Sequence, residues 1–377
     1  MTTLYAAMGN ALAIIRSQHG QWQADLALID KPTQCIAVDP LRPRQLYCGT
    51  FGQGLWWSDD AGATWHAVGP GLTSNKVMAV AVSRLERSGE MGVVWAGTEP
   101  SMLFRSEDGG QSWQERESLK HLPSAPTWSF PPRPWTHHVR WIEPDPVVAE
   151  RLYVAIELGG VMRSLDGGRT WEDRKSGAQP DAHTLHCHRL APGRVYEAAG
   201  GGYAESSDAG TTWHGYDQGL PWHYLWGLAI APDDPDVEIV SVSPGPRHAH
   251  DHSVSSTPTG MAANHGARTG LGSGQHGRGG PPPWASYDYH GPEATIYRRS
   301  HGGTWQESRT GLPDPRGTLA YTLASDESEP GVFYAAPHEG DFFRSTDTGR
   351  TWEKLGIAWP AHYHGERVNG LIVVNET

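Results

Sequence analysis

The sequence has few cysteines, no excess of positive charge and no long apolar run. Three cysteines among 377 residues, without a Cys-x-x-Cys spacing, argue against a disulfide framework and a paired-cysteine zinc site. A net charge of −12 gives no support for nucleic acid or an anionic membrane as partner. No stretch approaches about 18 apolar residues, so we expect no membrane span. The first residues lack a basic segment followed by an apolar one, so we expect a cytoplasmic chain with free thiols.

Glycine, proline and tryptophan are abundant instead, at 46, 29 and 17 residues. Such a composition suggests many short strands joined by tight turns, with one tryptophan in each repeating unit. The expected unit is found as a motif of the form Ser-x-Asp-x-Gly-x-Thr/Ser-Trp. Five complete copies begin at Ser58, Ser106, Ser164, Ser206 and Ser345, and two shorter copies without the Asp begin at Ser17 and Ser300.

Each part of the motif has a physical role in a hairpin turn. We expect the Asp to cap the backbone of the turn and the Gly to supply a positive φ. The Ser and Thr hydroxyls add bonds to the backbone, and the Trp packs into the core between sheets. The motif therefore marks a hairpin between two outer strands of a small antiparallel sheet.

The intervals between copies predict the number of sheets. Successive copies are 41, 48, 58, 42, 94 and 45 residues apart, and a four-stranded propeller blade needs about 40–50. The longest interval contains residues 244–292, a Gly/Pro/His-rich insertion that we place in the sixth blade. The segment from Gly370 to Glu376 resembles an inner strand without followers. We therefore predict an all-β fold with one domain over residues 1–377. It is a seven-bladed β-propeller of four-stranded antiparallel blades, closed by the C-terminal strand joining the N-terminal blade.

The motif resembles the Asp-box, or BNR repeat, and the resemblance covers nearly the whole chain. It implies a propeller and is nearly silent on function. Sialidases with this repeat carry an arginine triad and an early Phe/Tyr-Arg-Ile-Pro motif, which this sequence lacks. Xyloglucanase-type glycosidases use two propellers, sortilin-type receptors are secreted and disulfide-rich, and photosystem assembly factors bind protein partners. The chain is most similar to the cytosolic bacterial BNR-repeat propellers.

Histidines and carboxylates recur where inner strands begin and where second strands meet third strands. We aligned the inner strands on their prolines (Pro40, Pro144, Pro192 and Pro232), and this alignment brings the side chains together at one mouth of the channel. The expected metal ligands are His138, His183, His186, His223 and His364. The expected catalytic residues are Glu157, Glu99, Arg140 and His188. Imidazoles and carboxylates suit a divalent transition metal such as Zn, Mn, Fe, Cu or Ni.

Two classes of function remain open. In the first, a metal-dependent hydrolase or lyase, with an oxidase as a variant, acts on a small-molecule substrate at the channel mouth. In the second, a non-catalytic scaffold binds a protein partner on that face, and a glycosidase-like Asp-box enzyme is a further alternative. The insertion adds His248, His250 and His252, which we expect to be exposed. Because it follows a second strand, we expect the insertion to cover the same face as a lid.

Overall fold

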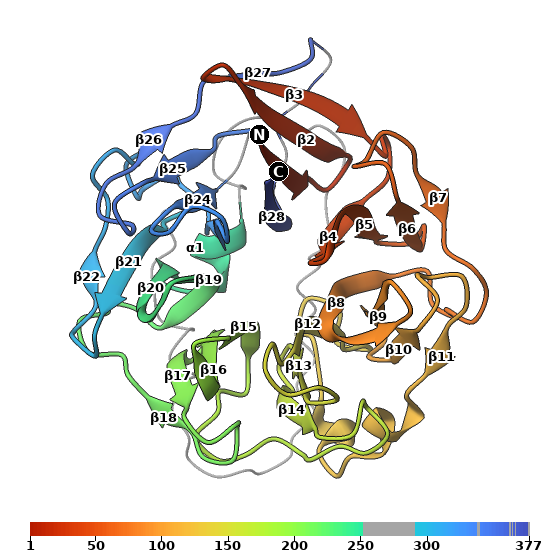
Figure 1. Cartoon of the computed structure of the whole chain (residues 1–377). Coiled ribbons are helices and arrows are strands. Elements are labelled where there is room, and N and C mark those ends of the chain that lie inside the picture. The colour runs from red at the N-terminus through yellow and green to blue at the C-terminus, as the bar shows by residue number, and fades with distance from the viewer. Residues whose placement is uncertain (252–290, 338–339, 362, 364, 366, 376–377) are drawn as a thin grey trace, which may run out of the picture.

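The protein is a propeller of seven small sheets around a central channel (Figure 1). The computed structural model describes residues 1–251, 291–337, 340–361, 363, 365 and 367–375. The all-β, seven-bladed fold predicted from the repeats is confirmed. Among the described residues, no helix has the length and apolar character needed to cross a membrane.

The blades share one strand order from the channel outward, and we number them from the N-terminal blade. The inner strands are β28 (Gly370–Asn375), β4 (Thr33–Asp39), β8 (Val77–Ser88), β12 (Val139–Pro144), β15 (Ala182–His188), β19 (Tyr224–Ala231) and β23 (Thr322–Ser325). The second strands are β1 (Thr2–Ala7), β5 (Arg42–Thr50), β9 (Met91–Thr98), β13 (Leu152–Ile156), β16 (Ala191–Ala199), β20 (Asp234–Ser243) and β24 (Phe333–Ala336). The third strands are β2 (Leu12–Gln18), β6 (Leu55–Ser58), β10 (Leu103–Ser106), β14 (Gly160–Ser164), β17 (Gly202–Ser206), β21 (Thr295–Ser300) and β25 (Phe343–Ser345). The outer strands are β3 (Gln21–Ala27), β7 (His66–Ala67), β11 (Gln114–Glu115), β18 (His214–Gly215), β22 (Gln306–Glu307) and β26 (Glu353–Lys354).

Two blades depart from the four-stranded plan. The fourth blade has three strands, and a single bridge between Arg163 and Glu172 stands in place of the outer one. The first blade gains a fifth strand, β27 (Ile357–Ala358), which pairs in parallel with β3. The helices are short: η1 (Glu117–His121), η2 (Ala125–Thr127) and α1 (Pro246–His250).

The strands are apolar because both faces of each blade are covered. All five residues of β13, from Leu152 to Ile156, are fully buried. A strand packed on both sides becomes a continuous apolar run rather than an alternating one. The core therefore consists of clusters between neighbouring blades, such as Tyr5 and Ile14 of the first blade against Ile36 of the second.

The C-terminal strand closes the ring. β28 pairs antiparallel with β1 over six residues, from Gly370 opposite Ala7 to Asn375 opposite Thr2. It lies innermost in the N-terminal blade, as predicted, so the first blade contains strands from both ends of the described chain. This pairing removes the exposed edge that β1 would otherwise present.

The motif turns have the expected hydrogen bonds. In the fourth complete copy, Ser206 Oγ accepts the Gly210 N–H at 2.7 Å and Asp208 Oδ1 accepts the Thr212 N–H at 2.8 Å. Gly210 has φ +81°, a value that side chains rarely adopt, and Trp213 is 6% exposed. The same two bonds recur in the four other complete copies.

The Ser206 hydroxyl makes a testable contribution to stability. Ser206→Ala leaves the buried Gly210 N–H without an acceptor, which costs about 1–3 kcal/mol. We expect urea unfolding to show this loss, with an unchanged dependence on urea concentration. The exposed neighbour provides the control, because Ser207→Ala is expected to change stability by less than about 0.5 kcal/mol. Equal effects of the two substitutions would contradict this role.

The sixth blade contains the inserted segment between its second and third strands. β20 ends at Ser243 and β21 begins at Thr295. The first part of the insertion is the helix α1 rather than an exposed loop, and it is tied to the blades. The carbonyls of His248 and Ala249 accept the N–H groups of Glu293 and Ala320 at 3.0 and 3.1 Å. His252 and the rest of the expected lid, residues 252–290, lie outside the described residues.

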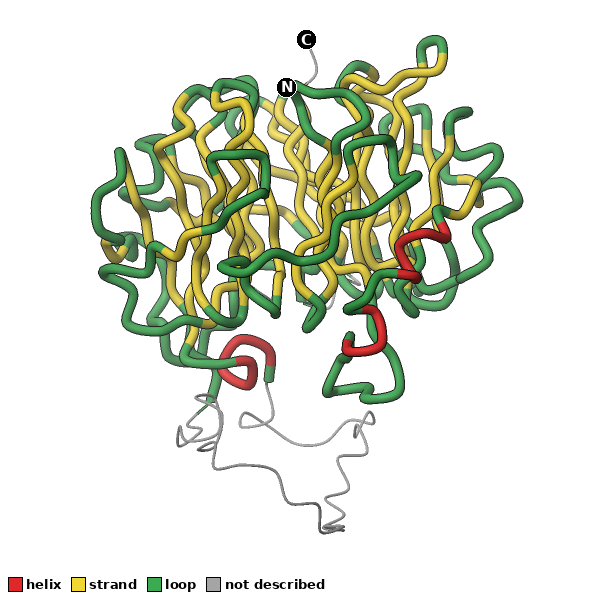
Figure 2. Tube along the Cα trace, turned by 90° about the horizontal axis from the view of Figure 1, so that it is seen from below, coloured by secondary structure: helices red, strands yellow, loops and turns green. Residues whose placement is uncertain are grey.

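Helix α1 marks one face of the propeller. It lies beyond the ends of the strands, opposite the N-terminus (Figure 2). We call this the lower face. Because β1 begins at the opposite side and β28 runs antiparallel to it, the lower face holds the starts of the inner strands and the turns after the second strands.

Candidate functional site

The inner strands are irregular where they start at the lower face. Five of them contain a β-bulge near their first residues. A bulge places one extra residue in a strand and re-aims its side chain. The residues at the bulges are Gln34, Met78, Arg140, His183 and, in β19, Trp226 with Gly227.

Trp226 is the centre of the contacts across the channel. The guanidinium carbon of Arg140 lies 4.3 Å from the centre of the Trp226 ring, and that of Arg367 lies 4.8 Å from it. The rings of His183 and His250 lie 4.9 and 4.2 Å from the same ring. Arg140 belongs to the fourth blade and Arg367 precedes the inner strand of the first. Neither blade neighbours the sixth, so these contacts cross the channel.

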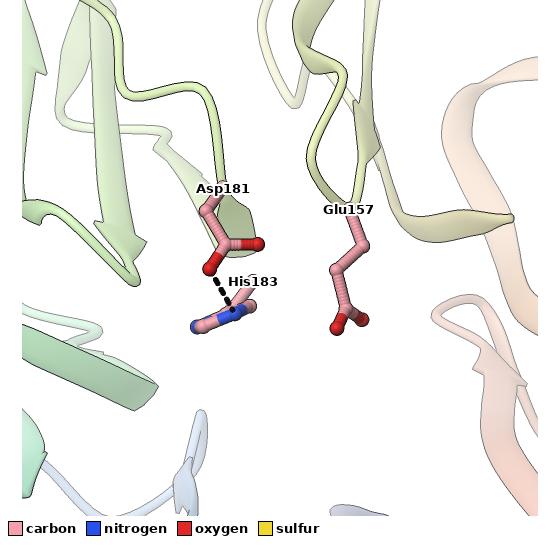
Figure 3. Close-up of side chains that lie close together, drawn as sticks. All are labelled: Glu157, Asp181 and His183. Carbon is pink, nitrogen blue, oxygen red and sulfur yellow. Dashed lines mark ion pairs between the residues drawn. The ribbon is translucent and has the colours of Figure 1, made fainter. Parts of the chain in front are cut away.

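Beside Trp226, three potential metal ligands face one another (Figure 3). Glu157 follows β13, Asp181 precedes β15, and His183 is the bulged residue of β15. One ligand atom from each lies within 4.8 Å of the others. Two carboxylates and an imidazole are a ligand set that suits divalent transition metals.

The backbone fixes the orientation of His183. Its Nδ1 lies 2.6 Å from the Leu225 carbonyl oxygen, which only accepts, so Nδ1 carries a proton. Nε2 is therefore the atom that faces Asp181 Oδ2, at 3.5 Å, and it is buried without a hydrogen-bond partner. An N–H to carbonyl bond of this kind orients the histidine ligands of metal sites. The ring is fully buried, and an orphaned Nε2 beside two carboxylates fits a metal ion.

A proton competes for the same atom. Burial lowers the pKa of His183, but the nearby carboxylate of Asp181, followed by that of Glu157, raises it above 6.5 overall. A proton on Nε2 places a positive charge beside the two carboxylates. A metal ion that binds at Nε2 displaces that proton.

Glu157 is held as a carboxylate. Burial raises its pKa, but the hydrogen bond from His138, the charge of His138, and those of His183 and Arg140 outweigh burial and bring the pKa to about 2. His138 Nε2 lies 3.0 Å from Glu157 Oε2. This bond engages Nε2, so His138 orients Glu157 in the structure rather than joining the three-residue cluster.

Glu99 lies behind His138 and is already neutralised. Arg133 forms an ion pair with Glu99, and Lys76 Nζ lies 3.4 Å from its Oε1. Glu99 Oε2 is 3.9 Å from His138 Nδ1, too far for a hydrogen bond. Glu99 thus belongs to the surroundings of His138, one step away from the cluster.

Two further predicted histidines lie deeper in the channel wall. His186 Nε2 donates to the Leu228 carbonyl at 3.0 Å, and burial lowers the pKa of His186 to about 4. His188 Nε2 donates to the Ala231 carbonyl at 2.9 Å, and its Nδ1 accepts the Leu190 N–H. At about 3.3 Å per residue, these two lie roughly 10 and 16 Å along the strand from His183. Their contacts join the fifth blade to the sixth.

The proline alignment is wrong for these blades. Pro144 is the last residue of β12, whereas Pro192 lies beyond the hairpin turn in β16. The register instead pairs Val139 with Ile156 and Ala182 with Ala199, so Arg140 and His183 are the equivalent bulged residues. His138 consequently corresponds to Asp181 and not to His186.

Of the two remaining predicted ligands, His223 is exposed and does not join the cluster. His364 lies outside the described residues. Asp181 was missed, although its position two residues before His183 was a usable signal because both lie at the strand start. Tyr224 and His250 were also missed as partners: the Tyr224 hydroxyl lies 2.9 Å from His250 Nε2.

A second acidic group is less suited to a ligand. Asp234, Asp236 and His301 also bring ligand atoms within 4.8 Å of one another, at the turns on the opposite face. Asp236 is already paired with Arg194 at 2.5 Å, and the His301 side chain is 70% exposed. The lower-face cluster is the better candidate because it is buried and its imidazole is unpartnered.

A buried carboxyl near the cluster gives a pH prediction. Burial raises the pKa of Glu197 from 4.5 to about 8, the charge of Asp181 adds to this, and the Gln179 N–H opposes it. A raised pKa in the folded state contributes stability that is fully present below pH 4.5 and is lost as the pH rises to about 8. Each pH unit of such a shift corresponds to about 1.4 kcal/mol.

Glu197→Gln removes the charge that is costly to bury. We expect the variant to match the wild type at pH 4.5 and to exceed its stability by at least about 1 kcal/mol at pH 8.5, measured by urea unfolding. Glu353→Gln, at an exposed position, is the control and is expected to show no such difference. A Glu197→Gln effect that is the same at both pH values would contradict the raised pKa.

Comparison with known proteins supports the fold. An ancestral GH74 enzyme is 17% identical, with a TM-score of 0.57 over 85% of this chain and 38% of its own. YCF48 bound to a D1 peptide is 16% identical, with a TM-score of 0.52 over 86% and 80%. The RRP9 WD40 repeats are 11% identical, with a TM-score of 0.56 over 98% and 88%.

These likenesses concern architecture only. The chain spans about 38% of the length of the GH74 enzyme, and the identities are too low to transfer an activity. No family model and no curated protein matches the sequence. The similar structures include both an enzyme and propellers described by a bound peptide or by WD40 repeats, so the fold fits either class.

Proposed function

We propose that the protein binds a divalent transition metal through Glu157, Asp181 and His183 and uses it to act on a small molecule as a hydrolase or lyase. The observation that carries the proposal is the buried, unpartnered His183 Nε2 beside two carboxylates. A bound metal of this class polarises a carbonyl or lowers the pKa of a water molecule. The chain's own residues hold the ligands in place: Leu225 orients His183, and His138 orients Glu157.

The glycosidase alternative needs a second carboxyl group besides Glu157. A glycosidase needs one carboxyl group with a raised pKa to protonate the leaving group, beside a second that stays ionised. The pKa of Glu157 is lowered to about 2, so Glu157 fits only the ionised member, and the acid would have to be a residue with a raised pKa such as the buried Glu197. The repeats' turn bonds agree with kinship to Asp-box proteins, which is compatible with either chemistry.

A binding role is the second candidate, and one observation favours it. Trp135, on the loop before β12 at the lower face, has 80% of its surface exposed. Exposed aromatic residues of this kind are common anchors in protein interfaces. In that case a protein partner docks on the lower face, and the histidines serve only as hydrogen-bond partners within the fold.

Thermal unfolding distinguishes the two candidates. Chelator-treated protein is heated alone and with Zn, Mn, Fe, Cu or Ni salts. A ligand at 100 times its Kd stabilises the folded state by about 2.7 kcal/mol, so we expect at least one metal to raise Tm by a few degrees. The metal that does so is then used in hydrolase and lyase assays. No rise with any metal would contradict the proposed site and leave the binding role.

A further inference from the structure

Two arginines that the cluster does not use lie on the same ring, that of Trp226, near the start of the inner strands. Arg140 and Arg367 both stack on Trp226, at 4.3 and 4.8 Å. Each is half-buried, so part of each residue stays accessible to solvent. They come from the fourth and first blades, and only the fold brings them together.

Neither guanidinium is satisfied by the protein. Among the described residues, neither makes a hydrogen bond or ion pair, and Arg140 Nε and Arg367 Nη2 are buried without partners. Each guanidinium has five N–H donors. Stacking on Trp226 occupies the faces of the groups and leaves their donor edges unpaired.

The two charges also repel each other. Burial and, after it, the charge of Arg140 together lower the pKa of Arg367 to about 10. Both groups remain cationic at neutral pH. The carboxylates of Glu157 and Asp181 act on Arg140 only at longer range, since no ion pair within 4.0 Å joins them. The buried Arg299, by contrast, is paired, since it contacts Glu238 at 2.9 Å.

The neighbouring histidine does not add a third charge. Burial, Arg367, His183 and Arg140 together lower the pKa of His250 well below 6.5, so the ring is neutral. Burial raises the pKa of the Tyr224 hydroxyl well above 10, so it keeps its proton, and its oxygen lies 2.9 Å from His250 Nε2. His250 Nδ1 is buried without a hydrogen-bond partner.

Cationic guanidinium groups with unpaired N–H donors at a channel mouth are complementary to an oxyanion. We propose that Arg140 and Arg367 bind the carboxylate or phosphate group of the substrate, next to the Glu157, Asp181 and His183 cluster. The inference rests on the proposed function, which supplies the reaction. It adds the class of substrate, a small anionic molecule. It explains why two guanidinium groups lie on one tryptophan ring without an acidic partner, and the fork geometry of arginine matches both oxyanions.

The test measures binding of inorganic phosphate and of succinate by isothermal titration calorimetry, each with chelator-treated and with metal-loaded protein. We expect one of the two anions to bind to wild-type protein. Arg140→Gln and Arg367→Gln should each weaken that binding by at least about 10-fold. Arg140→Lys and Arg367→Lys keep the charge and lose the forked arrangement of donors. Their anion affinities should lie between those of the wild type and the Gln variants. Arg189→Gln, an exposed change, is the matched control and should bind as the wild type does.

The outcomes separate this inference from the proposed function. Arginine-dependent binding to chelator-treated protein supports the anion site even if no metal ever binds. Metal binding without arginine-dependent anion binding overturns the anion site and leaves the metal site intact. Preference for phosphate or for succinate identifies the substrate as a phosphate or a carboxylate compound. If the Gln variants do not fold, the Lys variants decide: wild-type affinity in both would overturn the inference.

Discussion

A chain that ends at Asn369 is expected not to fold. Such a chain lacks β28, whose six residues pair with β1 and whose Leu371 and Val374 are buried in the clusters on either side of the first blade. Burying one such side chain contributes about 1.5–3 kcal/mol, and total stability is about 5–15 kcal/mol. The combined loss of these buried side chains and of the pairing with β1 therefore exceeds the stability of a domain of this kind.

Circular dichroism and thermal unfolding of the truncated chain test this expectation. A cooperative transition within a few degrees of the full-length value would contradict the closing role of β28. A synthetic peptide of residues 370–377, added in excess, should restore the transition because it supplies the missing strand. As a control, Leu371→Ala in the full chain should lower stability by about 2–5 kcal/mol and still leave a folded protein.

Asp181→Asn is expected to weaken metal binding by about 100-fold or more. Even residues that only support a metal ligand contribute 10–100-fold to affinity, and Asp181 is proposed to be a ligand itself. The amide keeps the shape of the side chain and loses its charge. The Leu158 N–H donates to Asp181 Oδ1 at 3.3 Å, and the amide oxygen of asparagine accepts this bond equally well. The local fold should therefore persist.

Calorimetric titration with the metal that raises Tm measures this effect. Asp233→Asn is the matched control, because Asp233 is exposed in the turn between β19 and β20, at the far end of the channel. Removing its charge tests whether the general negative field of the protein attracts the cation. An equal loss of affinity in the two variants would mean that binding is non-specific.

The fold was predictable because its signal repeats. Each motif copy specifies a turn through its own residues: Ser206, Asp208 and Gly210 form their bonds without help from distant parts of the chain. The closing strand was predictable for a related reason, since an apolar strand without followers has only one open position in a ring. The absence of a fourth strand from the fourth blade could not be predicted, because no comparable sequence motif marks it.

The site was predictable only in outline. Glu157 and His183 follow from their positions at the end of a second strand and the start of an inner strand. The bulges were not visible, because one extra residue in a strand changes no pattern in composition. The bulge in β15 was therefore missed, and Pro192 lies beyond the turn that follows β15. For these two reasons the predicted alignment grouped His186 and His188 with His183, although they lie deeper along the strand.

The contacts across the channel had no sequence signal at all. Arg140, Trp226 and Arg367 are far apart in the chain and belong to blades that do not touch. Their meeting depends on the channel diameter, which the seven-fold closure sets. Helix α1 was likewise hidden in a Gly/Pro/His-rich segment, although it brings His250 to within 4.2 Å of Trp226.

The most direct test of the account is the metal content of untagged protein purified without chelator, measured by inductively coupled plasma mass spectrometry for the wild type, His183→Ala and His186→Ala. The two histidines lie on the same strand, but only His183 has a free Nε2 beside two carboxylates. We predict close to one metal ion per chain in the wild type and in His186→Ala, and none in His183→Ala. A wild-type protein without metal, or metal retained in His183→Ala, would contradict the account.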